Sequence, residues 1–167
     1  MILIGGGSRS GKSNAALALL HSAGSRRGFI ATAEAYDDQM RERIARHRTE
    51  RDRSIVTWEE PLAVAERIEA EGGCYDAIVV DCLTLWLSNL MIAGDRDIEA
   101  ESRRLVDVAA NAKANIILVT NEVGCGIVPE NALARRFSDA AGRLNQMAAA
   151  CAAEVRWMIF GIGLKLK

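Results

Sequence analysis

The chain has 167 residues, of which 50% are hydrophobic and 26% are charged, and its formal net charge is -1. This length suits one domain with a full hydrophobic core, so we expect a single domain over residues 1–167. A charge so close to zero does not predict a nucleic-acid partner. The four cysteines are scattered and the chain has only two histidines, so no zinc-ligand spacing can be assembled. We expect the four thiols to behave as small apolar residues in a reducing cytosol.

No segment has the pattern of a signal peptide or of a membrane span. Residues 1–4 are apolar, but glycines follow at once, whereas a signal peptide needs a longer apolar stretch. The most apolar long stretch, 77–93, is interrupted by polar residues such as Asp81 and Asn89. It therefore predicts a buried strand followed by a buried helix. We expect a cytoplasmic protein without a membrane span.

Short apolar runs alternate with helical patterns along the chain. The expected strands are residues 1–4, 28–32, 55–58, 77–80, 115–120 and 155–160, to which 162–166 can add an edge strand. The expected helices are residues 12–22, 37–47, 61–73, 98–113 and 131–153, and one that begins near 83. Continuous apolar strands separated by helices are typical of a sheet that is covered on both faces. We therefore predict an α/β fold with a mostly parallel central sheet and helices on both faces.

Residues 5–13, GGGSRSGKS, match the phosphate-binding pattern G-x-x-x-x-G-K-[ST] from Gly6 onward. Small residues allow backbone N–H groups to surround a β-phosphate, and the following helix adds the positive end of its dipole. In such a P-loop Lys12 reaches the β- and γ-phosphate oxygens, and the Ser13 hydroxyl can bind Mg²⁺. A chance glycine turn is the alternative, but the apolar strand before the loop and the helix after it favour a P-loop. The expected nucleotide contacts are Gly6, Gly7, Ser8, Arg9, Ser10, Gly11, Lys12 and Ser13.

Asp81 is the second candidate for the metal site. It directly follows the apolar run 77–80, and P-loop proteins hold Mg²⁺ with an acidic residue at the end of a neighbouring strand. The alternative is that Asp81 caps the next helix. The two roles are compatible, and we favour the metal role, shared with Ser13.

His47 follows Met40 and Ile44 at helical spacing, which by itself favours a buried histidine near the end of a helix. Nearby arginines can instead hold phosphates while a neutral imidazole attacks one of them. Interspersed acidic residues also allow the arginines to form a solvated helix face. The residues alone leave these alternatives open. The arginines are Arg41, Arg43, Arg46, Arg48, Arg51 and Arg53.

A regulatory GTPase is not expected, because its guanine motif N-K-x-D and its D-x-x-G motif are both missing. The corresponding segments read Asn121-Glu122-Val123 and Asp81-Cys82-Leu83-Thr84. The glycine-bearing segment 121–131, NEVGCGIVPEN, has the character of a loop that contributes to a site.

Taken together, these segments closely resemble the bifunctional adenosylcobinamide kinase / adenosylcobinamide-phosphate guanylyltransferases of cobalamin biosynthesis. The resemblance runs over almost the full length and is loose only in residues 54–73 and 94–113. The histidine segment combined with TNEVG-x-GIVPE is its most specific part. The matching segments are GGGSRSGKS, IATAE (30–34), DDQMRERIARHR (37–48), VVDCLTLWLSNLM (79–91), TNEVGCGIVPENALARRFSDAAGRLNQ (120–146) and GIGLKLK (161–167).

The resemblance implies a two-step enzyme that uses Mg²⁺. A nucleoside triphosphate, ATP or GTP, first phosphorylates the hydroxyl of the aminopropanol arm of adenosylcobinamide. GTP then guanylylates a histidine, which passes GMP to the new phosphate and gives adenosylcobinamide-GDP. The guanylylated histidine of the family falls on His47, and this implication overrides the packing interpretation of that residue.

The resemblance also implies a RecA-like P-loop fold and a homotrimer. Two alternatives remain at this point, a P-loop small-molecule kinase without nucleotidyl transfer and a nucleotide-gated partner-binding module. The missing switch motifs and the expected lack of an exposed apolar stretch count against the second. Beyond the P-loop, the implied nucleotide contacts are Ala31, Thr32, Ala33, Arg48, Thr49, Glu50, Arg51, Glu59 and Asp81.

Overall fold

The computed structural model describes residues 1–35, 38, 41–42, 52 and 54–167. The predicted nucleophile His47 lies outside the described residues, and so do the neighbouring candidates Arg48, Thr49, Glu50 and Arg51.

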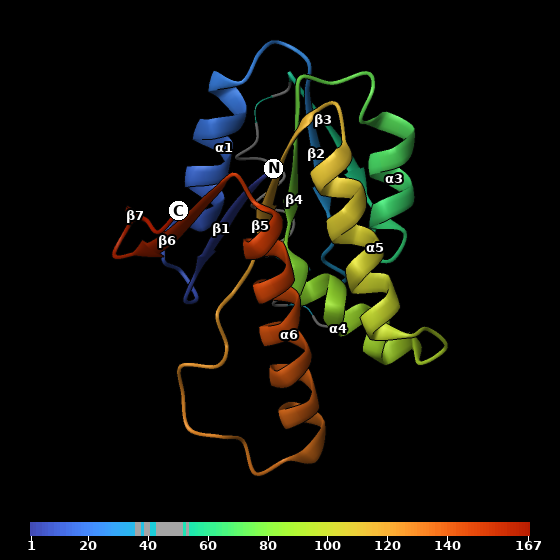
Figure 1. Ribbon diagram of the computed structural model, residues 1–167, viewed down its shortest axis with the longest axis vertical. Helices are drawn as coiled ribbons and strands as arrows, with labels where there is room; N and C mark the ends of the chain where they lie inside the picture. The colour runs from blue at the N-terminus through green and yellow to red at the C-terminus, as the bar shows by residue number, and fades with distance from the viewer. Residues whose placement is uncertain (36–37, 39–40, 43–51, 53) are drawn as a thin grey trace.

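The centre of the fold is one sheet with the strand order β3-β2-β4-β5-β1-β6-β7 (Figure 1). All pairings are parallel except the last, in which β7 runs antiparallel to β6. The predicted strands and the predicted edge strand are thus confirmed. Their bounds are β1 (Ile2–Gly6), β2 (Arg27–Ala31), β3 (Ile55–Glu59), β4 (Ala77–Asp81), β5 (Asn115–Val119), β6 (Glu154–Ile159) and β7 (Ile162–Lys165).

Helices cover both faces of the sheet, as predicted, but unequally. In Figure 1, α1 lies on one side of the sheet, and α3, α5 and α6 lie on the other. The helix after β4 is short and packs with α5 and α6. The bounds of the helices in the described residues are α1 (Lys12–Ser22), α3 (Val64–Glu71), α4 (Leu83–Ala93), α5 (Ile98–Asn111) and α6 (Ala132–Cys151).

Two hydrophobic cores follow from the alternation of side chains along the strands. In β4, for example, Ile78 belongs to the cluster under α3, α4, α5 and α6, whereas Val79 belongs to the cluster under α1. Leu3 and Ile4 of β1 divide in the same way. Because both faces are buried, the strands read as continuous apolar runs instead of alternating ones.

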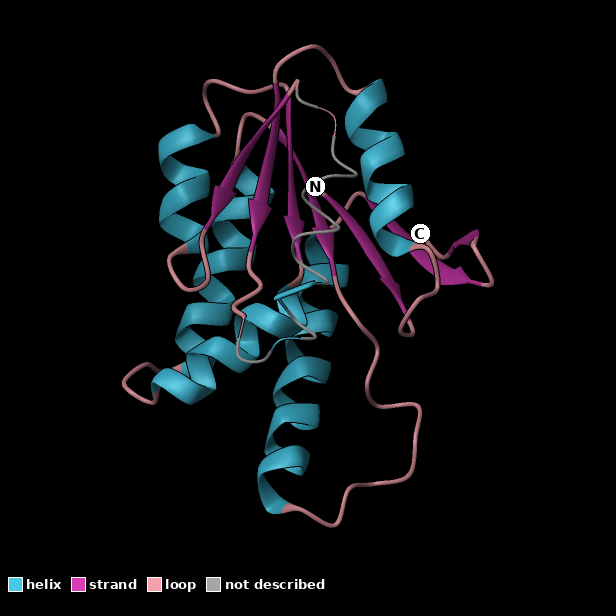
Figure 2. Cartoon of the chain, turned by 180° about the vertical axis from the view of Figure 1, so that it is seen from behind, coloured by secondary structure: helices cyan, strands magenta, loops and turns pink. Residues whose placement is uncertain are grey.

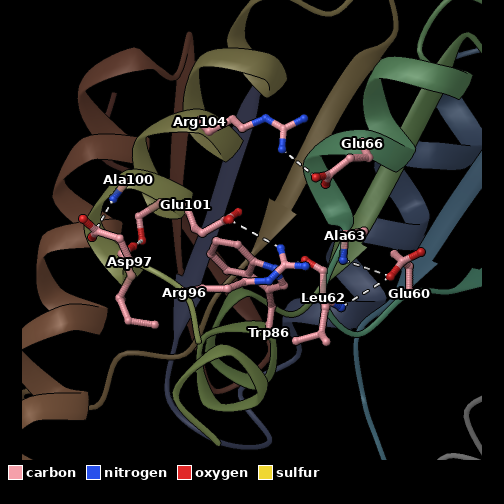
Figure 3. Close-up of polar contacts among 12 residues, drawn as sticks. Glu60, Leu62, Ala63, Glu66, Trp86, Arg96, Asp97, Ala100, Glu101 and Arg104 are labelled. Atoms are coloured by element: carbon pink, nitrogen blue, oxygen red, sulfur yellow. Dashed lines mark hydrogen bonds and ion pairs between the residues drawn. The ribbon is translucent and has the colours of Figure 1, made fainter. Parts of the chain in front are cut away.

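Polar contacts fix the helices of the larger layer to one another (Figure 3). Arg104 of α5 pairs with Glu66 and Glu69 of α3 at 2.5 Å and 3.0 Å. The buried Trp86 of α4 donates from its indole Nε1 to the carbonyl of Leu62 at 2.9 Å. This bond satisfies the polar atom of a side chain that is otherwise enclosed in the core.

The N-terminal ends of two helices agree with the expected boundaries because each has a side-chain cap. Asn131 caps α6 by accepting bonds from the backbone N–H groups of Leu133 and Ala134. Asp97 caps α5 in the same manner. By contrast, α3 begins at Val64, three residues after the expected start at Pro61, because Glu60 accepts a bond from the backbone N–H of Ala63 and holds this stretch as a turn.

The expectation that no apolar surface stretch is exposed is wrong. The hairpin of β6 and β7 exposes 92% of Phe160 and 69% of Ile162. The loop after β5 exposes 98% of Ile127 and 72% of Val128. An edge strand and a projecting loop have no neighbour on one side, and hydropathy along the chain does not show this. Among the described residues, none of the helices is both long and apolar enough to span a membrane.

The cysteine expectation also needs correction, because only Cys82 is buried. Cys74, Cys125 and Cys151 are exposed, and all four thiols are free. Burial raises the pKa of the Cys82 thiol, and the neighbouring Asp81 carboxylate raises it further. A thiol must ionise before it reacts as a nucleophile, so the four cysteines differ in both access and reactivity.

We expect a thiol reagent such as DTNB at pH 8 to modify three cysteines of the native protein quickly and the fourth only slowly. Denaturation should expose the fourth thiol and bring the total to four. The Cys82→Ala variant should keep the three fast reactions. Four equally fast reactions in the native protein would contradict this burial.

Candidate nucleotide site at the carboxyl edge of the sheet

The loop between β1 and α1 requires glycine at two positions. Gly6 has a φ of 149° and Gly11 a φ of 96°, values that side chains with a Cβ rarely adopt. A Cβ on Gly6 would also lie 2.5 Å from the carbonyl oxygen of Met158. The two glycines therefore allow the chain to turn sharply between strand and helix, as the P-loop motif predicts.

Lys12 is held within this loop. Its side chain is on the first turn of α1, the residue is only 7% exposed, and its Nζ donates to the carbonyl of Gly7 at 2.5 Å and to Ser10 Oγ at 3.4 Å. The loop itself thus fixes a positive charge beside its own backbone. That is the position from which a P-loop lysine neutralises phosphate oxygens.

The candidate metal site consists of one residue from α1 and one from the end of β4. Ser13 Oγ donates to Asp81 Oδ2 at 2.8 Å, across 68 residues of sequence. Asp81 does not take the alternative role of helix cap, because Cys82 occupies the N-cap position of α4. A hydroxyl and a carboxylate are the oxygen ligands that Mg²⁺ uses beside a nucleotide. The two residues therefore fit the metal role predicted for them.

Thr32, which follows β2, fixes the backbone on the carboxyl side of Asp81. Its N–H donates to the carbonyl of Asp81 at 3.1 Å. Its hydroxyl donates to the carbonyl of Cys82 and accepts from the N–H of Cys82, both at 2.8 Å. Thr32 is fully buried, so its side chain supports the Asp81–Cys82 turn from behind.

Sequence reasoning missed Asn89, which holds Thr32 in turn. Asn89 Nδ2 donates to the carbonyls of Thr32 and Pro61 at 2.8 Å and 3.1 Å. It thereby ties α4 to the segments that follow β2 and β3. The signal that could have revealed it is a polar residue inside the apolar helix 83–93, because a buried amide needs partners.

The loop after β5 is also attached to the P-loop. The N–H of Glu122 donates to the carbonyl of Gly6 at 3.1 Å. Asn121 Nδ2 donates to Thr84 Oγ1 at 2.7 Å, and Thr120 Oγ1 bonds with Asn145 Oδ1 of α6 at 2.7 Å. The start of this loop therefore lies beside the P-loop, and its contribution to a site stays a prediction.

The C-terminal hairpin supports the P-loop from the other side, a contact that the sequence did not reveal. The N–H of Gly161, in the turn between β6 and β7, donates to the carbonyl of Ser10 at 3.1 Å. A Cβ on Gly11 would lie 3.2 Å from the Cα of Gly161. The resemblance included this C-terminal segment, but only the fold shows that it touches the phosphate-binding loop.

The remaining described candidates for nucleotide contact lie at the carboxyl ends of neighbouring strands. Ala31, Glu59 and Asp81 stand level with one another on three neighbouring strands, since Ala31 pairs in register with both of the others. Ala33 follows Thr32 at the same edge and is partly exposed. His21, the other histidine of the chain, lies exposed on α1. The fold thus gathers the described nucleotide-contact candidates at the carboxyl edge of the sheet, where parallel sheets bind ligands.

Residues 2–166 of this chain match the family described as cobinamide kinase / cobinamide phosphate guanyltransferase. The chain belongs to this family. The match extends over the P-loop, the Asp81 turn, the loop after β5 and the C-terminal hairpin.

Two bacterial members show the same full-length agreement. The chain is 42% identical over 166 residues to the bifunctional adenosylcobalamin biosynthesis protein CobP of Pseudomonas aeruginosa, covering 99% of this chain and 96% of that protein. It is 41% identical over 181 residues to the bifunctional adenosylcobalamin biosynthesis protein CobU of Escherichia coli, covering 100% and 99%. The chain therefore spans nearly the whole length of these relatives.

Solved structures show the fold alone. The RadB recombinase is similar with a TM-score of 0.56 at 14% identity, over 93% of this chain and 72% of that one. The VirB11 ATPase of the Brucella suis type IV secretion system is similar with a TM-score of 0.50 at 14% identity, over 99% and 48%. The predicted α/β fold, with a mostly parallel central sheet and helices on both faces, is confirmed.

We expect Thr32→Val to lower the free energy of unfolding by about 1–3 kcal/mol, because the buried N–H and C=O of Cys82 lose their partner. Thr32→Ser keeps the hydroxyl and should lose less. Denaturant unfolding of both variants beside the parent measures the difference. A loss in Thr32→Ser as large as that in Thr32→Val would contradict a dominant role of the hydroxyl, because Val keeps the methyl group and Ser keeps the hydroxyl.

Proposed function

We propose that this protein phosphorylates adenosylcobinamide with a nucleoside triphosphate and then transfers GMP from GTP to the product, giving adenosylcobinamide-GDP in cobalamin biosynthesis. The observation that carries this proposal is the match to the cobinamide kinase / cobinamide phosphate guanyltransferase family over residues 2–166. The P-loop and the Ser13–Asp81 contact supply the parts that phosphate chemistry needs.

The P-loop residues Gly6 to Ser13 bind the phosphates in this proposal. Backbone N–H groups and the N-terminus of α1 face the phosphate oxygens. Lys12 neutralises negative charge that grows on the leaving phosphate. Whether the kinase step uses ATP or GTP depends on contacts with the nucleotide base. The candidates for these contacts are Ala31, Thr32, Ala33, Glu59 and residues 48–51.

Ser13 and Asp81 would hold Mg²⁺. When bound, the metal would offset the negative charge of the phosphates. The hydroxyl and carboxylate oxygens of this pair, together with the general need of P-loop chemistry for a divalent cation, support this part of the proposal.

In the kinase step the hydroxyl oxygen of the aminopropanol arm attacks the γ-phosphorus. The bond from that phosphorus to the β–γ bridging oxygen breaks, the nucleoside diphosphate leaves, and the hydroxyl proton is released. The chain's contribution is to orient the phosphates and to stabilise charge, since this chemistry depends mainly on positioning.

In the transfer step a neutral imidazole nitrogen of His47 attacks the α-phosphorus of GTP, and pyrophosphate leaves. A phosphate oxygen of the phosphorylated substrate then attacks the same phosphorus. The N–P bond breaks, the GDP-linked product forms, and the imidazole is restored. This role of His47 rests on the resemblance in the segment 37–48 and on the arginines around it.

We also propose a cytoplasmic homotrimer. The family resemblance suggests this assembly, and the exposed apolar side chains of the β6–β7 hairpin, including Phe160 and Ile162, offer a surface for contact between copies. A small-molecule kinase without guanylyl transfer is the runner-up, and the bifunctional names of the relatives do not favour it.

We expect Asp81→Asn to raise the Mg²⁺ concentration needed for half-maximal kinase activity by roughly 10- to 100-fold. The amide keeps the shape of the side chain but loses the charge that attracts the metal. A Mg²⁺ titration at saturating nucleotide measures the shift, and Glu34→Gln, an exposed acid outside the Ser13–Asp81 contact, serves as a charge-matched control. An unchanged titration would remove Asp81 from the metal site.

We expect His47→Asn to lower guanylyl transfer by roughly 10³-fold or more, as loss of a covalent nucleophile does. Phosphorylation of adenosylcobinamide should persist, so the phosphorylated compound accumulates. Incubation with α-labelled GTP measures covalent labelling of the same preparation, whose thermal unfolding is recorded alongside.

His21→Asn is the matched control, because the chain has only two histidines. This variant should keep both activities and the label. If label persists in His47→Asn and disappears in His21→Asn, the nucleophile has been assigned to the wrong histidine. Parallel loss of stability and of both activities in His47→Asn would favour a packing role for His47.

A further inference from the structure

A groove of about 470 Å³ lies between the loop after β5 and the outer side of α6. The loop contributes glycines and exposed apolar side chains, and the helix contributes mostly polar ones. The lining residues used below are Gly126, Ile127, Val128, Gly142, Arg143 and Gln146.

One end of the groove lies near the P-loop. At its inner end, Val123 and Gly124 follow Glu122, whose N–H bonds to the carbonyl of Gly6 at 3.1 Å. Figures 1 and 2 show the loop and the N-terminal half of α6 extending together beyond the edge at which the parallel strands end. The groove therefore lies outside the phosphate-binding loop, with one end close to it.

Gly142 lies in the middle of the 20-residue helix α6, where glycine is less stabilising than alanine. Its backbone has no left-handed φ, and an added Cβ would meet nothing within 4 Å. The residues of α6 that pack on the core, such as Ala141 and Leu144, point elsewhere. Neither backbone conformation nor internal packing requires glycine at this position, and its missing side chain leaves the helix surface open to close approach by another molecule.

The lining suits a large molecule that is apolar on its faces and polar at its rim. Ile127 is 98% exposed and Val128 72%. Arg143 and Gln146 make no side-chain hydrogen bond or ion pair within the described part of the chain, so their donors and acceptors are available. Arg135 holds the far end of the loop by donating to the carbonyls of Pro129 and Glu130 at 2.9 Å and 2.6 Å.

We propose that this groove binds the corrin ring of the substrate, which rests on the function proposed above. A corrin ring offers apolar carbon surface on the face that is free of the adenosyl group, and its peripheral amides both donate and accept hydrogen bonds. Only the short hydroxyl-bearing arm needs to reach the phosphates, so the ring lies outside the P-loop. Apolar contact with Ile127 and Val128, amide contacts with Gln146 and Arg143, and close approach at Gly142 meet these demands.

The test is Gly142→Leu, which fills the groove with a side chain that helices accept well. We expect binding of adenosylcobinamide, followed by its visible absorbance in equilibrium dialysis, to weaken at least roughly tenfold, and its KM to rise similarly. Labelling of the protein by α-labelled GTP, which needs no corrinoid, should be unchanged. Ala150→Leu places the same side chain on an exposed site of α6 outside the groove and should leave corrinoid binding intact.

A second pair of variants keeps the test independent of the helix. Ile127→Ser should also raise the KM for the corrinoid, and Ile92→Ser, at a 64% exposed position on α4, should not. If the parent protein binds no corrinoid, the proposed function itself fails. If the parent binds it and both groove variants bind it equally well, only the groove assignment fails.

The groove could instead be occupied by a second copy of this chain. Light scattering of each variant distinguishes that occupant from the corrinoid, because it measures the oligomeric state. Dissociation of the oligomer with corrinoid affinity unchanged would show that the groove is an interface between copies of this chain and would overturn the proposal. An unchanged oligomer with weakened corrinoid binding supports it.

Discussion

The hydrogen bond from Ser13 to Asp81 joins the two halves of the site, and the arrangement around it depends on that junction. Ser13 starts the helix that follows β1, and Asp81 ends β4, which is separated from β1 in the sheet by β5. For these side chains to meet at 2.8 Å, the strands must end at the same level and the P-loop must turn back over the edge. The parallel register and the glycines at 6 and 11 provide both conditions.

A layer of buried polar groups behind this junction keeps it in place. Thr32 bonds to both sides of the Cys82 peptide group, and Asn89 bonds to Thr32. Such groups are costly in a core unless every partner is present. When satisfied, they fix one arrangement of the backbone more specifically than apolar packing can. The site is thus supported from α4 as well as from the sheet.

The edge of the sheet is extended on two sides by segments that do not belong to the core. The β6–β7 hairpin contacts the P-loop through Gly161, and the loop after β5 forms with α6 a groove whose lining begins at Val123, next to Glu122. Both segments expose apolar side chains. The two clusters beside the sheet fill the core, so these extensions provide surface next to the site that the core itself does not offer.

The sequence by itself determined the strands, most helix boundaries and the P-loop, because these depend on local patterns: apolar runs, caps such as Asn131, and glycine spacing. It also indicated Asp81, since an acid directly after a buried strand is a local feature, and the resemblance supplied the family. Only the tertiary structure decided which distant residues meet. The bonds from Asn89 to Thr32 and from Gly161 to Ser10, the exposure of three of the cysteines, and the open space around Gly142 arise from chain packing. Hydropathy and residue spacing along the chain do not predict such contacts, because the burial of a side chain and its hydrogen-bond partners depend on which distant segments folding brings together.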